Sequence, residues 1–168
     1  MTVLVTAASK HGATREIAEA IARVLDEHGV AAERADLDDV RDLGRYDAVV
    51  LGSSIYLGQW LEPARKFVKR HADELGERRS WLFSSGPIVG DPPKADPADE
   101  AAGRRLLEVA HAREHKLFAG KVDKSKLGLL ERAAVRAARA SEGDYRDWDE
   151  IRAWGLTIAE DLRSRSDA

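Results

Sequence analysis

Residues 3–25, VLVTAASKHGATREIAEAIARVL, decide the fold of this chain because the hydrophobic period changes within them. Val3 to Ala8 is a short apolar run that ends in small residues, which is typical of a buried strand. From Thr14 onward the spacing is helical, and one helix face collects Ile17, Ile21, Val24 and Leu25. The loop between them, SKHGAT, therefore joins a strand to a helix.

The same alternation of strand and helix patterns continues along the chain. Further strands are expected at Ala31–Leu37, Ala48–Ser54, Ser80–Ser85 and His115–Ala119. Helices are expected at Ala64–Leu75, Pro97–Ala112, Leu127–Ala137 and Ile151–Leu162, with Asp147 or Asp149 as a cap near the start of the last one. Strands that alternate with helices of this length predict right-handed crossovers onto a parallel sheet in a doubly wound α/β domain.

The composition and net charge of the chain exclude several classes of function. A chain of 168 residues fits a single domain spanning 1–168, and its 27 basic and 30 acidic residues leave a net charge of only -3, which predicts no nucleic-acid partner. The absence of cysteine excludes thiolate nucleophiles and iron–sulfur clusters, so redox chemistry would need a bound cofactor. We find neither a signal sequence nor a run of about 20 apolar residues, and we expect a cytoplasmic location.

Three strand-to-helix junctions are rich in Gly, Ser and Thr, and ligands of doubly wound sheets bind beyond the carboxyl ends of the strands. The candidate cofactor-binding residues of the first junction are Ser9, Lys10, His11, Gly12, Ala13 and Thr14; those of the second are Ser53, Ser54, Ile55, Tyr56, Leu57 and Gly58; those of the third are Ser84, Ser85, Gly86 and Pro87. In the first junction, free amide groups and the helix dipole favour an anion, two hydroxyls add donors, and glycine allows close approach. The junction is therefore either a phosphate cradle or an ordinary βα turn.

The residue types and glycine spacing of the first junction exclude other known kinds of phosphate-binding loop. It matches neither a Walker loop nor a three-glycine dinucleotide fingerprint, so a monophosphate fits best. A receiver-type regulator needs acidic residues where this chain has Ala7, Ala8 and Ser9. Tyr56 is expected to contact a planar ligand, whereas Trp60 is as consistent with packing as with ligand contact. The remaining tryptophans are expected to pack, and the histidines form no cluster for a metal.

Taken together, these residues resemble the flavodoxin superfamily. Its phosphate loop has the form Ser/Thr, any, Thr, Gly, any, Thr; Ser9, Gly12 and Thr14 are retained here, while His11 replaces a hydroxyl. Within the superfamily, the chain looks like the menaquinone-dependent protoporphyrinogen dehydrogenase group. The resemblance is carried by SKHGATREIA (9–18), GSSIY (52–56), FSSGP (83–87), FAGKV (118–122) and DYRDWDEIRAWG (144–155).

The resemblance implies a five-stranded flavodoxin-like sheet of order 2-1-3-4-5 with helices on both faces and one FMN at the three junctions. It implies an FMN-dependent oxidoreductase that takes electrons from a small organic substrate and passes them to a quinone, in heme biosynthesis. The alternative is an electron-transfer flavodoxin with a protein redox partner, and a domain without cofactor is a third. Residues 121–146 would be the enlarged segment, whose expected helix either lies on an anionic membrane surface at the inner membrane face or packs on the domain. No catalytic acid or base and no metal ligand is assigned.

Overall fold

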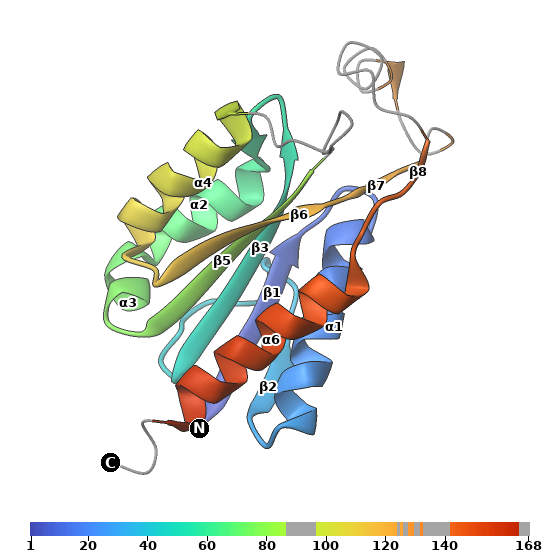
Figure 1. The fold of residues 1–168 in the computed structure, drawn as a ribbon. Helices are drawn as coiled ribbons and strands as arrows, with labels where there is room; N and C mark the ends of the chain where they lie inside the picture. Colours follow the sequence, from blue (N-terminus) through green and yellow to red (C-terminus); the bar gives the residue numbers. More distant parts are fainter. Residues whose placement is uncertain (87–96, 124, 126–127, 130–131, 133–141, 165–168) are drawn as a thin grey trace.

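The computed structural model describes residues 1–86, 97–123, 125, 128–129, 132 and 142–164. Five strands form one parallel sheet of order β2-β1-β3-β5-β6 (Figure 1). Their bounds are β1 Thr2–Ala8, β2 Ala31–Arg34, β3 Ala48–Tyr56, β5 Arg79–Gly86 and β6 Glu114–Ala119. Counted without the short strands, this is the order 2-1-3-4-5, which confirms the expected fold.

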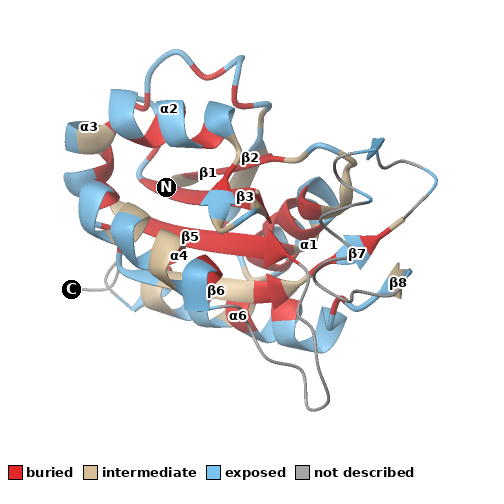
Figure 2. Cartoon of the chain, turned by 90° about the horizontal axis from the view of Figure 1, so that it is seen from above, coloured by how far each residue is buried: buried red, intermediate tan, exposed pale blue. Residues whose placement is uncertain are grey.

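Helices cover both faces of the sheet, as the predicted crossovers require. One face carries α1 (Ala13–Glu27) and α6 (Trp148–Arg163), and the other carries α2 (Glu62–Arg70), α3 (Ala72–Gly76) and α4 (Pro97–Ala110) (Figure 1). The central strands are accordingly buried along almost their whole length, which appears as a red band in Figure 2. Asp147 caps α6, since its Oδ1 accepts hydrogen bonds of 3.0 Å from the amides of Asp149 and Glu150.

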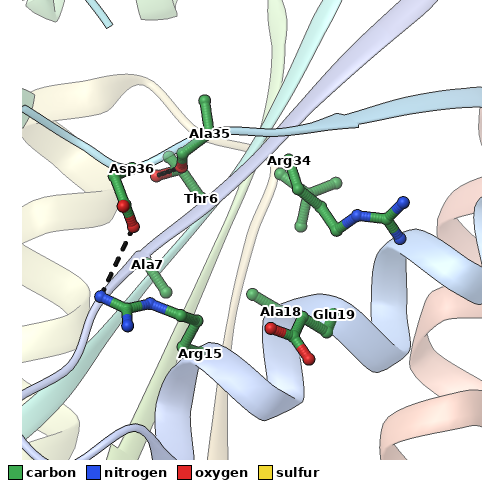
Figure 3. Close-up of a pocket in the computed structure, with 9 residues that line it drawn as sticks. Thr6, Ala7, Arg15, Ala18, Glu19, Arg34, Ala35 and Asp36 are labelled. Atoms are coloured by element: carbon green, nitrogen blue, oxygen red, sulfur yellow. Dashed lines mark hydrogen bonds and ion pairs between the residues drawn. The ribbon is translucent and has the colours of Figure 1, made fainter. Parts of the chain in front are cut away.

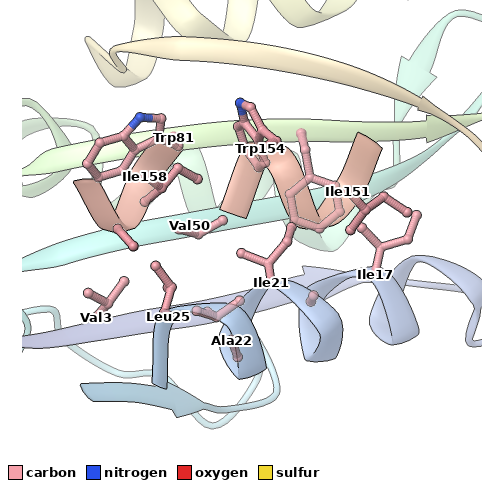
Figure 4. Close-up of a cluster of buried hydrophobic side chains, with 14 of the residues drawn as sticks. Val3, Ile17, Ile21, Ala22, Leu25, Val50, Trp81, Ile151, Trp154 and Ile158 are labelled. Carbon is pink, nitrogen blue, oxygen red and sulfur yellow. The ribbon is translucent and has the colours of Figure 1, made fainter. Parts of the chain in front are cut away.

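The core has two parts, one on each side of the sheet. On the α1 and α6 side, apolar residues of both helices pack against one another and against the strands (Figure 4). Trp81 and Trp154 are 4% and 5% exposed there, which confirms that they pack in the core. Trp148 differs, because it begins α6 and is 37% exposed, with the Arg146 guanidinium over its ring.

Several element boundaries differ from the expectation. The second strand ends at Arg34 rather than Leu37, whose side chain enters the core from a loop. The helix expected over 64–75 is divided at His71 into α2 and α3. Three short strands were not predicted: β4 (Gln59–Trp60), β7 (Lys121–Val122) and β8 (Gly143–Asp144).

The ends of the segment 121–146 are joined by antiparallel pairing of β7 with β8. Most of the expected helix over 127–137 lies outside the described residues. Among the residues that are described, no helix is both long and apolar enough to cross a membrane.

Candidate functional site

Strand register brings the three predicted junctions to one edge of the sheet. Ala8 of β1 pairs with Ser53 of β3, and Ser53 and Ser54 pair in turn with Ser84 and Ser85 of β5. Because all three strands are parallel, the loops that follow them lie side by side. The structure therefore assembles the candidate residues at one site, apart from Pro87, which lies outside the described residues.

The first junction has the geometry of an anion cradle. Gly12 is the N-cap of α1 with φ 91°, a left-handed conformation, and its amide donates to Ser9 Oγ at 3.0 Å. Glycine has no side chain with which to cap the helix, so the amides of the first turn keep their donors directed outward. A Cβ added to Gly12 would meet no heavy atom within 4 Å. The loop thus leaves room beside the helix N-terminus, and this fits a phosphate group.

A hydrogen bond ties the first junction to the second. Thr14 Oγ1 lies 2.7 Å from Ser54 Oγ, and Thr14 is 1% exposed. One hydroxyl donates to the other, so the second hydrogen stays available to an acceptor. This pair fixes the end of β3 against the start of α1.

The second junction is a hairpin instead of the expected loop. β3 continues to Tyr56 and returns as β4 through Leu57 and Gly58, whose φ angles are 50° and 69°. Two successive positive φ values are typical of a type I′ turn. Leu57 is 87% exposed at its tip, while Lys10 Nζ of the first junction lies 5.9 Å from the centre of the Tyr56 ring.

Three side chains that were predicted to bind the cofactor instead form contacts within the protein. Ser53 Oγ accepts from the Leu61 amide at 3.0 Å and donates to the Ser54 carbonyl at 2.9 Å. Ile55 packs in the core and is 3% exposed, and Ser84 is fully buried. At these positions, a ligand at the sheet edge could contact backbone groups more readily than side chains.

Trp60 packs and does not face the edge. Its Nε1 donates to Ser84 Oγ at 2.7 Å, and Ser84 Oγ lies 2.6 Å from Nε2 of His115 on β6. An indole nitrogen can only donate, so Ser84 can give its own hydrogen to a neutral His115. No role for His115 follows from the sequence, because its partner Ser84 lies 31 positions away in the chain.

This network predicts a pH dependence of stability. Burial lowers the pKa of His115 to about 4 from its ordinary value near 6.5. The unfolded chain therefore binds more protons between pH 4 and 6.5, and the free energy of unfolding should fall as pH falls through that window. The shift corresponds to about 3 kcal/mol, and partial exposure of the ring reduces our expectation to about 2 kcal/mol.

Urea unfolding at pH 7 and at pH 4.5 measures this loss. In His115→Gln the loss over the same interval should be smaller by about 2 kcal/mol, because the titrating group is removed. An equal loss in both proteins would show that His115 is not the group responsible.

Strand β5 includes the third junction as far as Gly86, where the strand ends. The Gly120 amide donates to the Gly86 carbonyl at 2.9 Å, and this bond ties the end of β5 to the residue between β6 and β7. Asp99 in the first turn of α4 is 7% exposed, and its Oδ2 lies 3.8 Å from the place of a Cβ at Gly86. Asp99 was missed because the position of α4 relative to this edge is set by tertiary packing.

A separate pocket lies between α1 and β2 (Figure 3). Four of its lining residues are charged, and Arg15 Nη2 lies 3.4 Å from Asp36 Oδ1. None of the predicted cofactor residues lines this pocket, so it is distinct from the edge at which the three junctions meet. Among the described residues, no group of three His, Asp or Glu side chains could hold a metal ion.

Comparison with known proteins finds a matching family model and curated relatives. Residues 4–149 match the family model described as "Flavodoxin domain". Protoporphyrinogen IX dehydrogenase [quinone] from Escherichia coli strain K12 is 26% identical in an alignment that covers 95% of this chain and 95% of that protein.

Solved structures share the fold. A flavodoxin from the domain Archaea superposes with a TM-score of 0.62 at 19% identity, over 97% of this chain and 99% of that one. Oxidised flavodoxin 1 from Bacillus cereus gives 0.60 at 15% identity, over 95% and 98% of the two chains.

Proposed function

Since the chain belongs to the flavodoxin domain family, we propose that it binds one FMN at the carboxyl edge of its sheet and works as a quinone-linked oxidoreductase. The observation that carries the proposal is the uncapped N-terminus of α1 at Gly12, joined to the end of β3 by the bond between Thr14 and Ser54. This arrangement offers backbone donors to a phosphate and, beside them, a hairpin and a strand end for a planar ring.

Different residues would bind the phosphate and the ring system of FMN. Amides of the first turn of α1, with the hydroxyls of Ser9 and Thr14, would hold the phosphate. Tyr56 on the hairpin and the backbone at Ser85 and Gly86 would flank the ring system. When bound, FMN supplies the transfer of electrons, and the protein supplies orientation and the polar surroundings of the ring. Thr14 can donate its hydrogen to the phosphate when its Oγ1 accepts from Ser54 Oγ.

The substrate proposal rests on the curated relative. Its name gives protoporphyrinogen IX as the electron donor and a quinone as the acceptor, and the similarity extends over 95% of both chains. We propose the same class of reaction here, in the cytoplasm. An electron carrier of the flavodoxin type would use the same FMN site with protein partners, and the shared fold is equally suited to it.

Flavin titration tests the cofactor. FMN added to purified protein should saturate near one equivalent, with quenching of flavin fluorescence by the neighbouring aromatic side chain. The double variant Ser9→Ala/Thr14→Ala removes two hydroxyl partners and should raise the Kd for FMN at least about 100-fold, since hydrogen bonds to charged groups contribute about 1.5 kcal/mol or more each. Binding of neither FMN nor FAD would overturn the proposal.

Turnover measurements distinguish the quinone-linked enzyme from the electron carrier. Oxidation of protoporphyrinogen with reduction of a menaquinone analogue supports the enzyme. Reduction of the bound flavin only by a reductase protein supports the carrier.

A further inference from the structure

Arg146 lies between β8 and α6, and its side chain is only 3% exposed. Two parallel hydrogen bonds join it to Asp144, from Nε to Oδ1 at 2.8 Å and from Nη2 to Oδ2 at 2.5 Å. Its remaining nitrogen, Nη1, donates to Glu16 Oε2 at 2.7 Å and to the Ala13 carbonyl at 3.2 Å. The guanidinium also lies 4.5 Å from the centre of the Trp148 ring. Every nitrogen of this guanidinium is thus engaged within the protein.

The contacts of Arg146 connect two parts of the candidate site. Ala13 and Glu16 belong to the first turn of α1, directly after Gly12. On the other side, Asp144 pairs with Lys121 where β8 lies antiparallel to β7, and the Tyr145 amide donates to the Gly120 carbonyl at 3.1 Å. Gly120 is in turn bonded to the end of β5 at Gly86. Arg146 therefore clamps the start of α1 to the strand ends on the same edge of the sheet.

Arg146 also affects the electrostatic environment of the N-terminus of α1, through its ion pair with Glu16. Glu16 stabilises the helix N-terminus, but its negative charge in the first turn opposes an incoming anion. The ion pair with Arg146 offsets that charge without using the backbone donors at the helix end. A buried bidentate arginine is suited to this because its geometry is rigid.

We propose that Arg146 is a positioning residue for phosphate binding: it fixes the first turn of α1 and offsets Glu16, so that affinity for a phosphorylated flavin depends on it. This inference rests on the proposed FMN site. It concerns the phosphate alone, and riboflavin, which has the same ring without the phosphate, serves as the discriminating ligand.

The test compares the Kd values for FMN and for riboflavin in the full-length protein. Arg146→Gln should raise the Kd for FMN about tenfold and change that for riboflavin less than twofold. Arg146→Lys should recover part of the affinity for FMN, since it restores the charge without the bidentate geometry. Adding Glu16→Gln to Arg146→Gln should also recover part of it, because this removes the one of the two carboxylates left without Arg146 that lies in the first turn of α1.

Arg113→Gln is the matched control. Arg113 also pairs with a carboxylate, since its Nη1 donates to both oxygens of Asp161 at 3.0 and 2.8 Å, and it lies 5.7 Å from the centre of an indole ring, but it precedes β6 at the opposite end of that strand. Its replacement should leave both Kd values unchanged.

Equal losses for FMN and riboflavin in Arg146→Gln, or no loss for either, would overturn the inference. If that variant does not fold, Arg146→Lys gives the same comparison, and a selective loss of FMN affinity is again the supporting result. Failure of the unmodified protein to bind FMN would instead overturn the proposed function, and this inference with it.

Discussion

Trp154→Ala should lower the free energy of unfolding by about 3–5 kcal/mol, the range measured for large aromatic side chains removed from cores. Trp154 is 5% exposed on α6 and meets two other aromatic rings edge to face: Phe83 with centroids 6.1 Å apart, and Phe118 at 5.6 Å. These rings pack α6 against β5 and β6, so removal of the Trp154 ring leaves a cavity between the helix and the sheet. Urea unfolding followed by far-UV circular dichroism measures the loss.

Trp148→Ala is the control on the same helix. Trp148 is 37% exposed, and its recorded ring contact is the guanidinium of Arg146, so its removal should cost about 1 kcal/mol or less. Trp154→Phe should recover most of the loss, because the buried Trp154 Nε1 has no hydrogen-bond partner among the described residues. Similar losses in the two alanine variants would contradict the account of the core.

The main strands and helices could be predicted because they depend on the local spacing of hydrophobic residues in the sequence. β1, β3 and β5 are buried on both faces, and each appears in the sequence as a short apolar run. The parallel topology then determines that the loops after these strands share an edge. The three junctions of the candidate site follow from that topology alone.

The parts that could not be predicted depend on conformations or contacts without a local signal. The hairpin after β3 requires a positive φ at Leu57, a residue type that seldom adopts one. The bond between Ser84 and His115 spans 31 positions, and that between Arg146 and Glu16 spans 130. Such pairs arise only once the sheet and α6 are packed, so residue types and spacing did not reveal them.

Gly12→Val should raise the Kd for FMN by at least about 100-fold, which corresponds to about 3 kcal/mol. The φ of 91° at Gly12 lies in a region that costs a β-branched residue about 1–3 kcal/mol. If the loop keeps its conformation, the valine side chain enters the space beside the helix N-terminus. If the loop relaxes, the amides of the first turn of α1 lose the arrangement that suits a phosphate. Both responses weaken binding, and flavin titration measures the result.

Gly29→Val separates this effect from backbone strain. Gly29 follows the other end of α1, has φ 78°, and likewise has no heavy atom within 4 Å of an added Cβ. The two variants therefore carry the same side chain in similar strained conformations at opposite ends of one helix, and both should lose about 1–3 kcal/mol of stability. Because only Gly12 adjoins the cradle, Gly29→Val should bind FMN as tightly as the unmodified protein. If the two variants lost FMN affinity equally, general destabilisation would explain the result, and the phosphate would have to bind elsewhere than at the N-terminus of α1.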